Sequence, residues 1–121
     1  MNVLHGHHHL TLCVGGAQED YDFHSNLLGL KSVKKTILYD GKLPIYHLYY
    51  GNENGDPGTL ITTFSFRHTG LKAARGSGQV RTIACSVPES ALAFWKARLE
   101  AHGYRAEELE RFGEQRLRFH H

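Results

Sequence analysis

The fold is decided by residues 7–14, which read HHHLTLCV and are followed by a Gly15-Gly16 turn. Successive side chains of a strand point to opposite faces. One face would carry His7, His9, Thr11 and Cys13, and the other would carry His8, Leu10, Leu12 and Val14. The second set is mainly apolar and suits packing under a helix. The first set offers His9 and Thr11 as the wall of a metal or ligand cleft, although a simple polar start of a strand fits the same residues.

Downstream of this strand the sequence predicts one helix and three more strands. The predicted elements are a helix over 17–28 and strands over 31–39, 45–50 and 59–66. The helix rests on apolar residues at helical intervals, and Gly29 suits its left-handed C-terminal cap; these apolar residues are Ala17, Tyr21, Leu27 and Leu28. The second strand is rich in β-branched and aromatic side chains, and an Asp40-Gly41 turn follows it. The order is therefore β-α-β-β-β.

The same pattern begins again after a loop rich in glycine and basic residues. The second set of predicted elements is a strand over 79–87, a helix after Pro88 and strands over 104–109 and 115–120. Leu92, Trp95 and Leu99 form the buried stripe of that helix, and Gly103 repeats the cap seen at Gly29. We therefore predict an α+β fold of two modules. The first is a βαβββ module over 1–66, residues 67–78 link the two, and 79–121 form a βαββ module that lacks its last strand.

Composition narrows the possible functions. The chain has 121 residues, 40% of them hydrophobic, and a formal net charge of only +2, so charge gives no case for binding nucleic acid or a membrane surface. No apolar run approaches the roughly 20 residues needed to cross a bilayer. Cys13 and Cys85 lie in apolar runs, and we expect buried, reduced thiols in a cytoplasmic protein, with a disulfide left open.

Along nearly its whole length the sequence resembles the (chloro)hydroquinone ring-cleaving 1,2-dioxygenases of the vicinal-oxygen-chelate superfamily. The resemblance in the first module is carried by His8-His9-Leu10-Thr11, Leu28-Gly29-Leu30, Val33-Lys34-Lys35-Thr36, Tyr39-Asp40-Gly41, residues 44–50, Pro57-Gly58-Thr59-Leu60 and Thr62-Thr63-Phe64. Later it is carried by Gly70, Gly76, Gly78, Phe94-Trp95, His102-Gly103 and Arg111-Phe112-Gly113. These segments occur in the same order as in the family, which makes the match more specific than any one motif.

The resemblance implies paired βαβββ modules cupped around Fe(II), held by two histidines and a carboxylate. That ligand set leaves positions free for an aromatic substrate and O₂. The family ligand carries over onto His9, while His8 and Thr11 match positions that shape the surroundings of the metal and take part in catalysis. The second histidine and the carboxylate belong to a C-terminal half of the family. We therefore expect an N-terminal portion of an extradiol-type dioxygenase acting on hydroquinone-like aromatics, which is not competent alone.

Other interpretations remain open at this stage. A metal-free binding module of the glyoxalase/bleomycin-resistance type, or a folded remnant without activity, would share this fold. We expect a homodimer, since an unpaired sheet edge recruits partners. His47 would be a second metal ligand if the fold brought it opposite His9. Cys13 is expected to be a small buried hydrophobe rather than a ligand.

Overall fold

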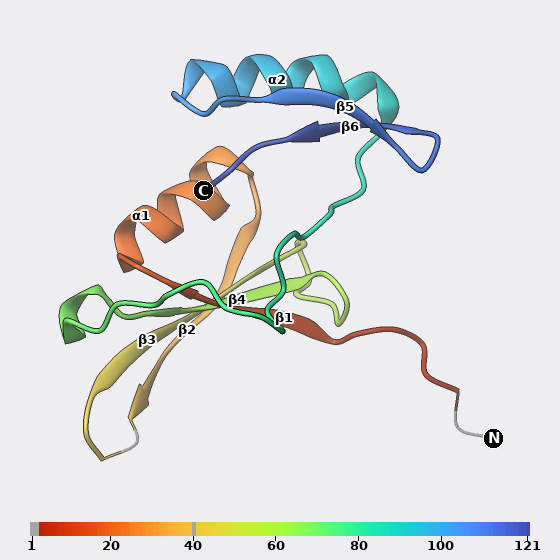
Figure 1. Ribbon diagram of the computed structural model, residues 1–121. Coiled ribbons are helices and arrows are strands. Elements are labelled where there is room, and N and C mark those ends of the chain that lie inside the picture. Colours follow the sequence, from red (N-terminus) through yellow and green to blue (C-terminus); the bar gives the residue numbers. More distant parts are fainter. Residues whose placement is uncertain (1–2, 40) are drawn as a thin grey trace. The chain divides into compact units, whose positions relative to one another are not determined.

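The computed structural model describes residues 3–39 and 41–121 (Figure 1). Internal contacts divide the chain into two compact units, the first ending at Ala74 and the second beginning at Arg75. This division falls inside the segment 67–78 that the sequence marks as a linker. Asp40, in the predicted turn after the second strand, lies outside the described residues.

The first unit is a four-stranded mixed sheet with one helical segment. Its elements are β1 (His9–Val14), α1 (Ala17–Tyr21), the π-helical segment η1 (Asp22–Leu27), β2 (Lys31–Tyr39), β3 (Pro44–Gly51), β4 (Leu60–Ser65) and the 3-10 turn η2 (Arg67–Thr69). The strand order is β1-β4-β3-β2, with β1 parallel to β4 and the other neighbours antiparallel. The predicted β-α-β-β-β order is confirmed, and the predicted second strand matches β2 at both ends.

The helical segment differs from the prediction in which residues it buries. Residues 17–28 are helical through Leu27, but the buried set is Asp20, Phe23, His24 and Leu27. Tyr21, which we expected in the apolar stripe, is 39% exposed. The buried positions still follow helical spacing, i, i+3, i+4 and i+7. Two of them are polar, so apolar periodicity identified Leu27 but missed Asp20 and His24.

A buried polar cluster joins this helical segment to the sheet. The Asp20 side chain is buried, and its Oδ2 accepts hydrogen bonds from the hydroxyls of Tyr50 (2.7 Å) and Thr63 (2.5 Å). His24 stacks on the Tyr50 ring at 4.6 Å, with its Nδ1 3.1 Å from Asp20 Oδ1. Burial alone would raise the pKa of Asp20, but the His24 imidazole and the two hydroxyls outweigh it and hold the pKa of this carboxyl below its ordinary value.

The second unit contains a helix and a hairpin. Its elements are η3 (Glu89–Ala91), α2 (Leu92–Ala101), β5 (Glu107–Arg111) and β6 (Glu114–Arg118). Leu99 is fully buried and Leu92 and Trp95 are half-buried, so the predicted stripe faces inward. Gly103 has φ +84°, the left-handed conformation that its role as a cap requires.

The predicted strand over 79–87 is wrong, because these residues form no strand ladder. A strand exists only if its backbone groups pair with a neighbour. In the first unit β1 pairs with the fourth strand of its module, β4. Among the described residues of the second unit only β5 and β6 are strands, and they pair with each other. Residues 79–87 thus have the composition of a first strand without the neighbour that makes one.

Both cysteines are free and exposed. The expectation of buried thiols is therefore wrong. Cys13 lies on the face of β1 that points away from α1. Cys85 lies in the segment 79–87, which pairs with no strand. Within the residues that the structure describes, no helix is long and apolar enough to span a bilayer.

Replacing Tyr50 by Phe tests the buried cluster. The change removes one of the two hydroxyls that bind Asp20 Oδ2 and leaves a buried carboxylate short of a donor, which costs about 1–3 kcal/mol of unfolding free energy. Urea unfolding followed by circular dichroism measures the effect. Tyr39→Phe is the matched control, because Tyr39 is 64% exposed and its change should be neutral. Equal stability of the two variants would contradict the role given to the cluster.

The depressed pKa of Asp20 predicts an acid-dependent stability. Because the folded-state pKa lies below the unfolded value of about 3.9, the carboxylate stabilises the fold fully above that pH. The contribution disappears as the pH falls through the folded-state pKa. Asp20→Asn should lower stability at neutral pH and flatten its decline in acid, as measured by thermal unfolding from pH 2 to 7. Asp22→Asn, at an exposed site, is the control. If Asp22→Asn flattened the loss of stability in acid to a similar extent, Asp20 would not be its source.

Candidate metal and ligand face

The side of the sheet opposite α1 gathers polar and aromatic side chains from three strands. We call it the histidine face, and it consists of His9, Thr11, His47, Tyr49, Thr62 and Phe64. The register places Thr11 beside Thr62 and Thr62 beside Tyr49. In the next row Phe64 pairs with His47. The other face carries Tyr50 and Thr63, which bind Asp20 of α1.

His8 and His9 contact each other at the start of β1. Their Nδ1 atoms are 3.1 Å apart and their rings meet edge to face with centroids at 5.3 Å. One of the two nitrogens must therefore carry the proton, and the tautomer of each ring depends on the other. This contact uses Nδ1 of His9 and leaves its Nε2 as the nitrogen available to a ligand or metal. The His8 ring therefore contacts the Nδ1 side of the His9 ring.

Thr11 is fixed by a hydrogen bond across the β1–β4 ladder. Its Oγ1 lies 2.9 Å from Oγ1 of Thr62, whose side chain is fully buried. Thr11 itself is exposed, two residues along the strand from His9. The bond ties the hydroxyl of Thr11 to the neighbouring strand and fixes its direction. The three residues selected from the sequence, His8, His9 and Thr11, therefore lie together at one end of β1.

His47 lies on the same face and is held by its neighbours. Its ring stacks on Phe64 at 4.0 Å and tilts against Tyr49 at 4.2 Å, while Nδ1 is 2.8 Å from the Tyr49 hydroxyl. Burial, followed by the nearby charges of His9 and Lys34, lowers the pKa of His47 and favours the neutral ring. Its Nε2 is buried and has no hydrogen-bond partner among the described residues.

The described residues do not hold a complete metal centre. No group of three or more His, Cys, Asp or Glu side chains that could bind an ion occurs among residues 3–39 and 41–121. A site of two histidines and one carboxylate needs three such donors. His9 offers one imidazole with Nε2 available, so this part of the chain fits such a centre as the donor of a single ligand. Cys13 shares the strand face of His9, but is exposed rather than the buried hydrophobe we expected.

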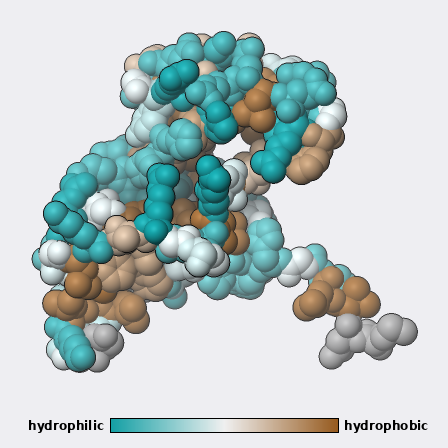
Figure 2. Space-filling view, viewed as in Figure 1, coloured by the Kyte–Doolittle hydropathy of each residue, from teal (hydrophilic) through white to brown (hydrophobic). Residues whose placement is uncertain are grey.

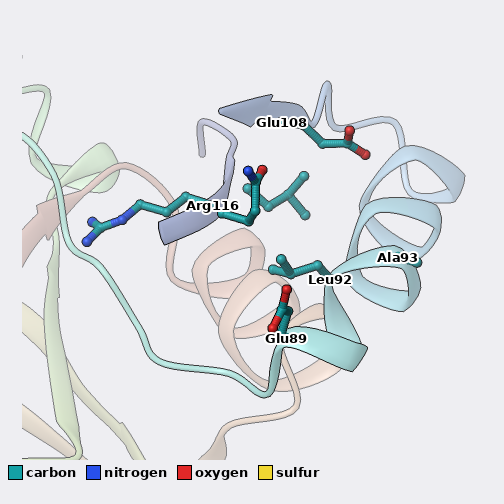
Figure 3. Close-up of a pocket in the computed structure, with 7 residues that line it drawn as sticks. Glu89, Leu92, Ala93, Glu108 and Arg116 are labelled. Atoms are coloured by element: carbon teal, nitrogen blue, oxygen red, sulfur yellow. The ribbon is translucent and has the colours of Figure 1, made fainter. Parts of the chain in front are cut away.

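The second unit has a cavity whose lining residues differ in kind from those of the histidine face. It has a volume of about 300 Å³ and is lined by Glu89, Leu92, Ala93, Glu108, Gln115, Arg116 and Leu117. Figure 3 shows Leu92 between α2 and the strands, with the Arg116 side chain extending away from the helix. Arg116 forms an ion pair with Glu114 at 2.7 Å. None of the residues selected from the sequence lines this cavity, and it contains no histidine.

The structure places two further residues, His47 and Tyr49, on the histidine face beside those selected from the sequence. Strand alternation over 45–50 already places both on one face, which was the signal that could have found them. The sequence does not reveal the register in which the strands pair. The pairing of His47 with Phe64, and of Tyr49 with Lys34, brings distant segments of the chain together on the histidine face.

Comparison with known proteins identifies relatives over nearly the whole chain. No family model matches it. The chain is 44% identical over 119 residues to the chlorohydroquinone/hydroquinone 1,2-dioxygenase of Sphingobium indicum, covering 98% of this chain and 37% of that protein. It is 45% identical over 114 residues to the Bacillus subtilis protein named "Putative ring-cleaving dioxygenase MhqO", covering 94% and 36%. The chain thus spans about a third of the length of the curated relatives that it matches.

Two solved structures resemble the chain in fold. A Bacillus subtilis crystal structure described as a "putative dioxygenase" superposes with a TM-score of 0.85 at 45% identity, covering 94% of this chain and 36% of that one. The fosfomycin resistance protein FosX of Listeria monocytogenes, crystallised with Mn(II), shares the fold with a TM-score of 0.69 at 16% identity, covering 98% and 85%. In sequence and in fold, the chain is homologous to one portion of the hydroquinone ring-cleaving dioxygenases and has the fold of the vicinal-oxygen-chelate superfamily.

Proposed function

We propose that this chain supplies one wall of the active site of an Fe(II)-dependent, extradiol-type dioxygenase that cleaves hydroquinone-like aromatics. The observation that carries the proposal is His9. Its Nδ1 is engaged by His8, its Nε2 is available, and it stands on the face of the sheet that α1 leaves uncovered. The relatives named as ring-cleaving dioxygenases support the reaction class. Iron as the metal and the extradiol mode of cleavage remain proposals.

The residues of this chain have distinct roles in the proposed site. His9 binds the metal through Nε2. His8 fixes the tautomer and direction of the His9 ring through the Nδ1–Nδ1 contact, as an outer partner of a ligand imidazole does. Thr11, anchored to Thr62, presents a hydroxyl beside the ligand for hydrogen bonding to substrate. When bound, Fe(II) supplies the electron transfer between the aromatic and O₂ that ring cleavage needs.

A metal-free binding module is the second candidate. It is favoured by one observation, that the described residues contain no cluster of three metal-binding side chains. Such a module would hold an aromatic molecule against the histidine face without cleaving it. The two candidates differ in whether the chain has affinity for a divalent metal that depends on His9.

We also propose that the protein is cytoplasmic and forms a homodimer. Supporting self-association, exposed apolar side chains gather at the free end of the β2–β3 hairpin (Figure 2); these are Ile37, Leu38, Tyr39, Leu43 and Tyr46. The strand β2 is also an edge of the sheet, and an exposed apolar edge favours pairing with another chain.

Sedimentation velocity tests the dimer. We expect a concentration-dependent dimer that Ile37→Lys shifts toward monomer, because the added charge opposes apolar pairing at the edge strand. Val80→Lys, at an exposed site in the second unit, is the control and should leave the dimer unchanged. A single monomeric species over the micromolar range would eliminate the homodimer proposal.

Anaerobic Fe(II) titration by calorimetry tests the metal site. The chain should bind Fe(II) weakly, since it supplies one of three ligands, and His9→Ala should reduce the affinity by about tenfold or more. The chain has ten histidines, so His102→Ala serves as the matched control and should change nothing. Identical isotherms for the native chain, His9→Ala and His102→Ala would contradict the assignment and favour the metal-free module.

A further inference from the structure

The Nε2 atom of His47 is a polar group without a partner at the centre of the histidine face. It is buried, and no described residue hydrogen-bonds to it. A buried polar atom left without a partner is costly, so its persistence in a fold calls for an explanation such as a ligand. The ring itself is half-buried rather than enclosed. A ligand resting on this face reaches Nε2 when neighbouring side chains move aside.

The neighbours of His47 determine whether its Nε2 donates or accepts a hydrogen bond. Nδ1 is 2.8 Å from the Tyr49 hydroxyl. A phenolic O–H is a stronger donor than a neutral imidazole N–H, and an imidazole lone pair is a stronger acceptor than a phenol oxygen. Tyr49 therefore donates to Nδ1, and the single ring proton of neutral His47 resides on Nε2. In this tautomer Nε2 is a donor, and has no lone pair for a metal.

The charge around the donor selects an anionic acceptor. The ammonium of Lys34 lies over the Tyr49 ring, 5.3 Å from its centroid, and Lys34 pairs with Tyr49 across the β2–β3 ladder. A cation and an N–H donor on one surface together favour an oxygen that bears negative charge. The rings of Tyr49 and Phe64, on either side of His47, offer apolar surface to an aromatic molecule.

We propose that His47, Tyr49 and Lys34 form a recognition site for the phenolate oxygen of an aromatic ligand on the histidine face. Nε2–H of His47 donates to the phenolate oxygen, Lys34 balances its charge, and Tyr49 is the positioning residue that fixes the His47 tautomer. This rests on the proposed function, whose hydroquinone-like substrate would present such an oxygen. It removes His47 from the candidate metal ligands and makes it a residue that selects substrate.

The test uses the intact chain, free of metal in excess chelator, so that it is independent of His9 and iron. The probe is 4-nitrophenol at a pH where it is ionised, and binding is followed by the shift of its absorption band. 4-Nitroanisole, with the same ring but no ionisable oxygen, is the matched ligand control. We expect saturable binding of the phenolate and binding of the anisole at least about tenfold weaker, the size of one charge-assisted hydrogen bond.

Three variants assign the contacts. His47→Phe keeps a ring between Tyr49 and Phe64 and removes the donor, and Lys34→Met removes the charge; each should weaken phenolate binding about tenfold. Lys35→Met is the matched control, because Lys35 lies over Tyr46 on the other face of the sheet and its loss should leave binding unchanged. Dispersed amide NMR spectra establish that each variant is folded.

Long-range ¹H–¹⁵N NMR of the native chain provides an independent readout. It should show His47 with its proton on Nε2, and Tyr49→Phe should lose that fixed tautomer. The proposal is overturned if the proton lies on Nδ1, if phenolate and anisole bind equally or not at all, or if Lys35→Met weakens binding as much as Lys34→Met. Any of these would leave the iron titration, and with it the proposed function, unaffected.

Discussion

The arrangement of the first unit depends on the buried carboxylate of Asp20. It accepts hydrogen bonds from two hydroxyls, Tyr50 on β3 and Thr63 on β4, and thereby fastens the helical segment after β1 to the two central strands of the sheet. A buried charge is tolerable only when its oxygens are satisfied. The cluster therefore fixes which face of the sheet is covered, and the alternation of each strand fixes what the other face presents.

That division gives the sheet one face that packs against the helical segment and, opposite it, the histidine face. Tyr50 and Thr63 are used for packing, while their neighbours Tyr49 and Thr62 point to the side that carries His9, Thr11 and His47. Within the described residues the histidine face holds no group of three metal-binding side chains. The chain spans about a third of the length of the dioxygenase relatives.

Local sequence patterns predict most elements of the first unit correctly. They fail where pairing with distant segments of the chain determines the structure. Strand alternation and glycine caps gave β1, β2 and the end of the helical segment, because these depend on nearby residues. Residues 79–87 have strand composition but no ladder, and no local pattern reveals a missing neighbour. Apolar periodicity does not point to Asp20 as a buried residue, because the hydroxyls that bind it, on Tyr50 and Thr63, are 30 and 43 residues away along the chain.

Paramagnetic broadening by Mn(II) tests most directly whether a metal binds at the start of β1, as we propose. Amide and histidine signals of the native chain are recorded while Mn(II) is added in small steps. If the metal binds His9, the signals of His8, His9 and Thr11 broaden first, while those of His24, buried on the opposite face, and His102 remain sharp. Broadening that spreads evenly over the exposed histidines, or begins at another of the chain's ten, would contradict it.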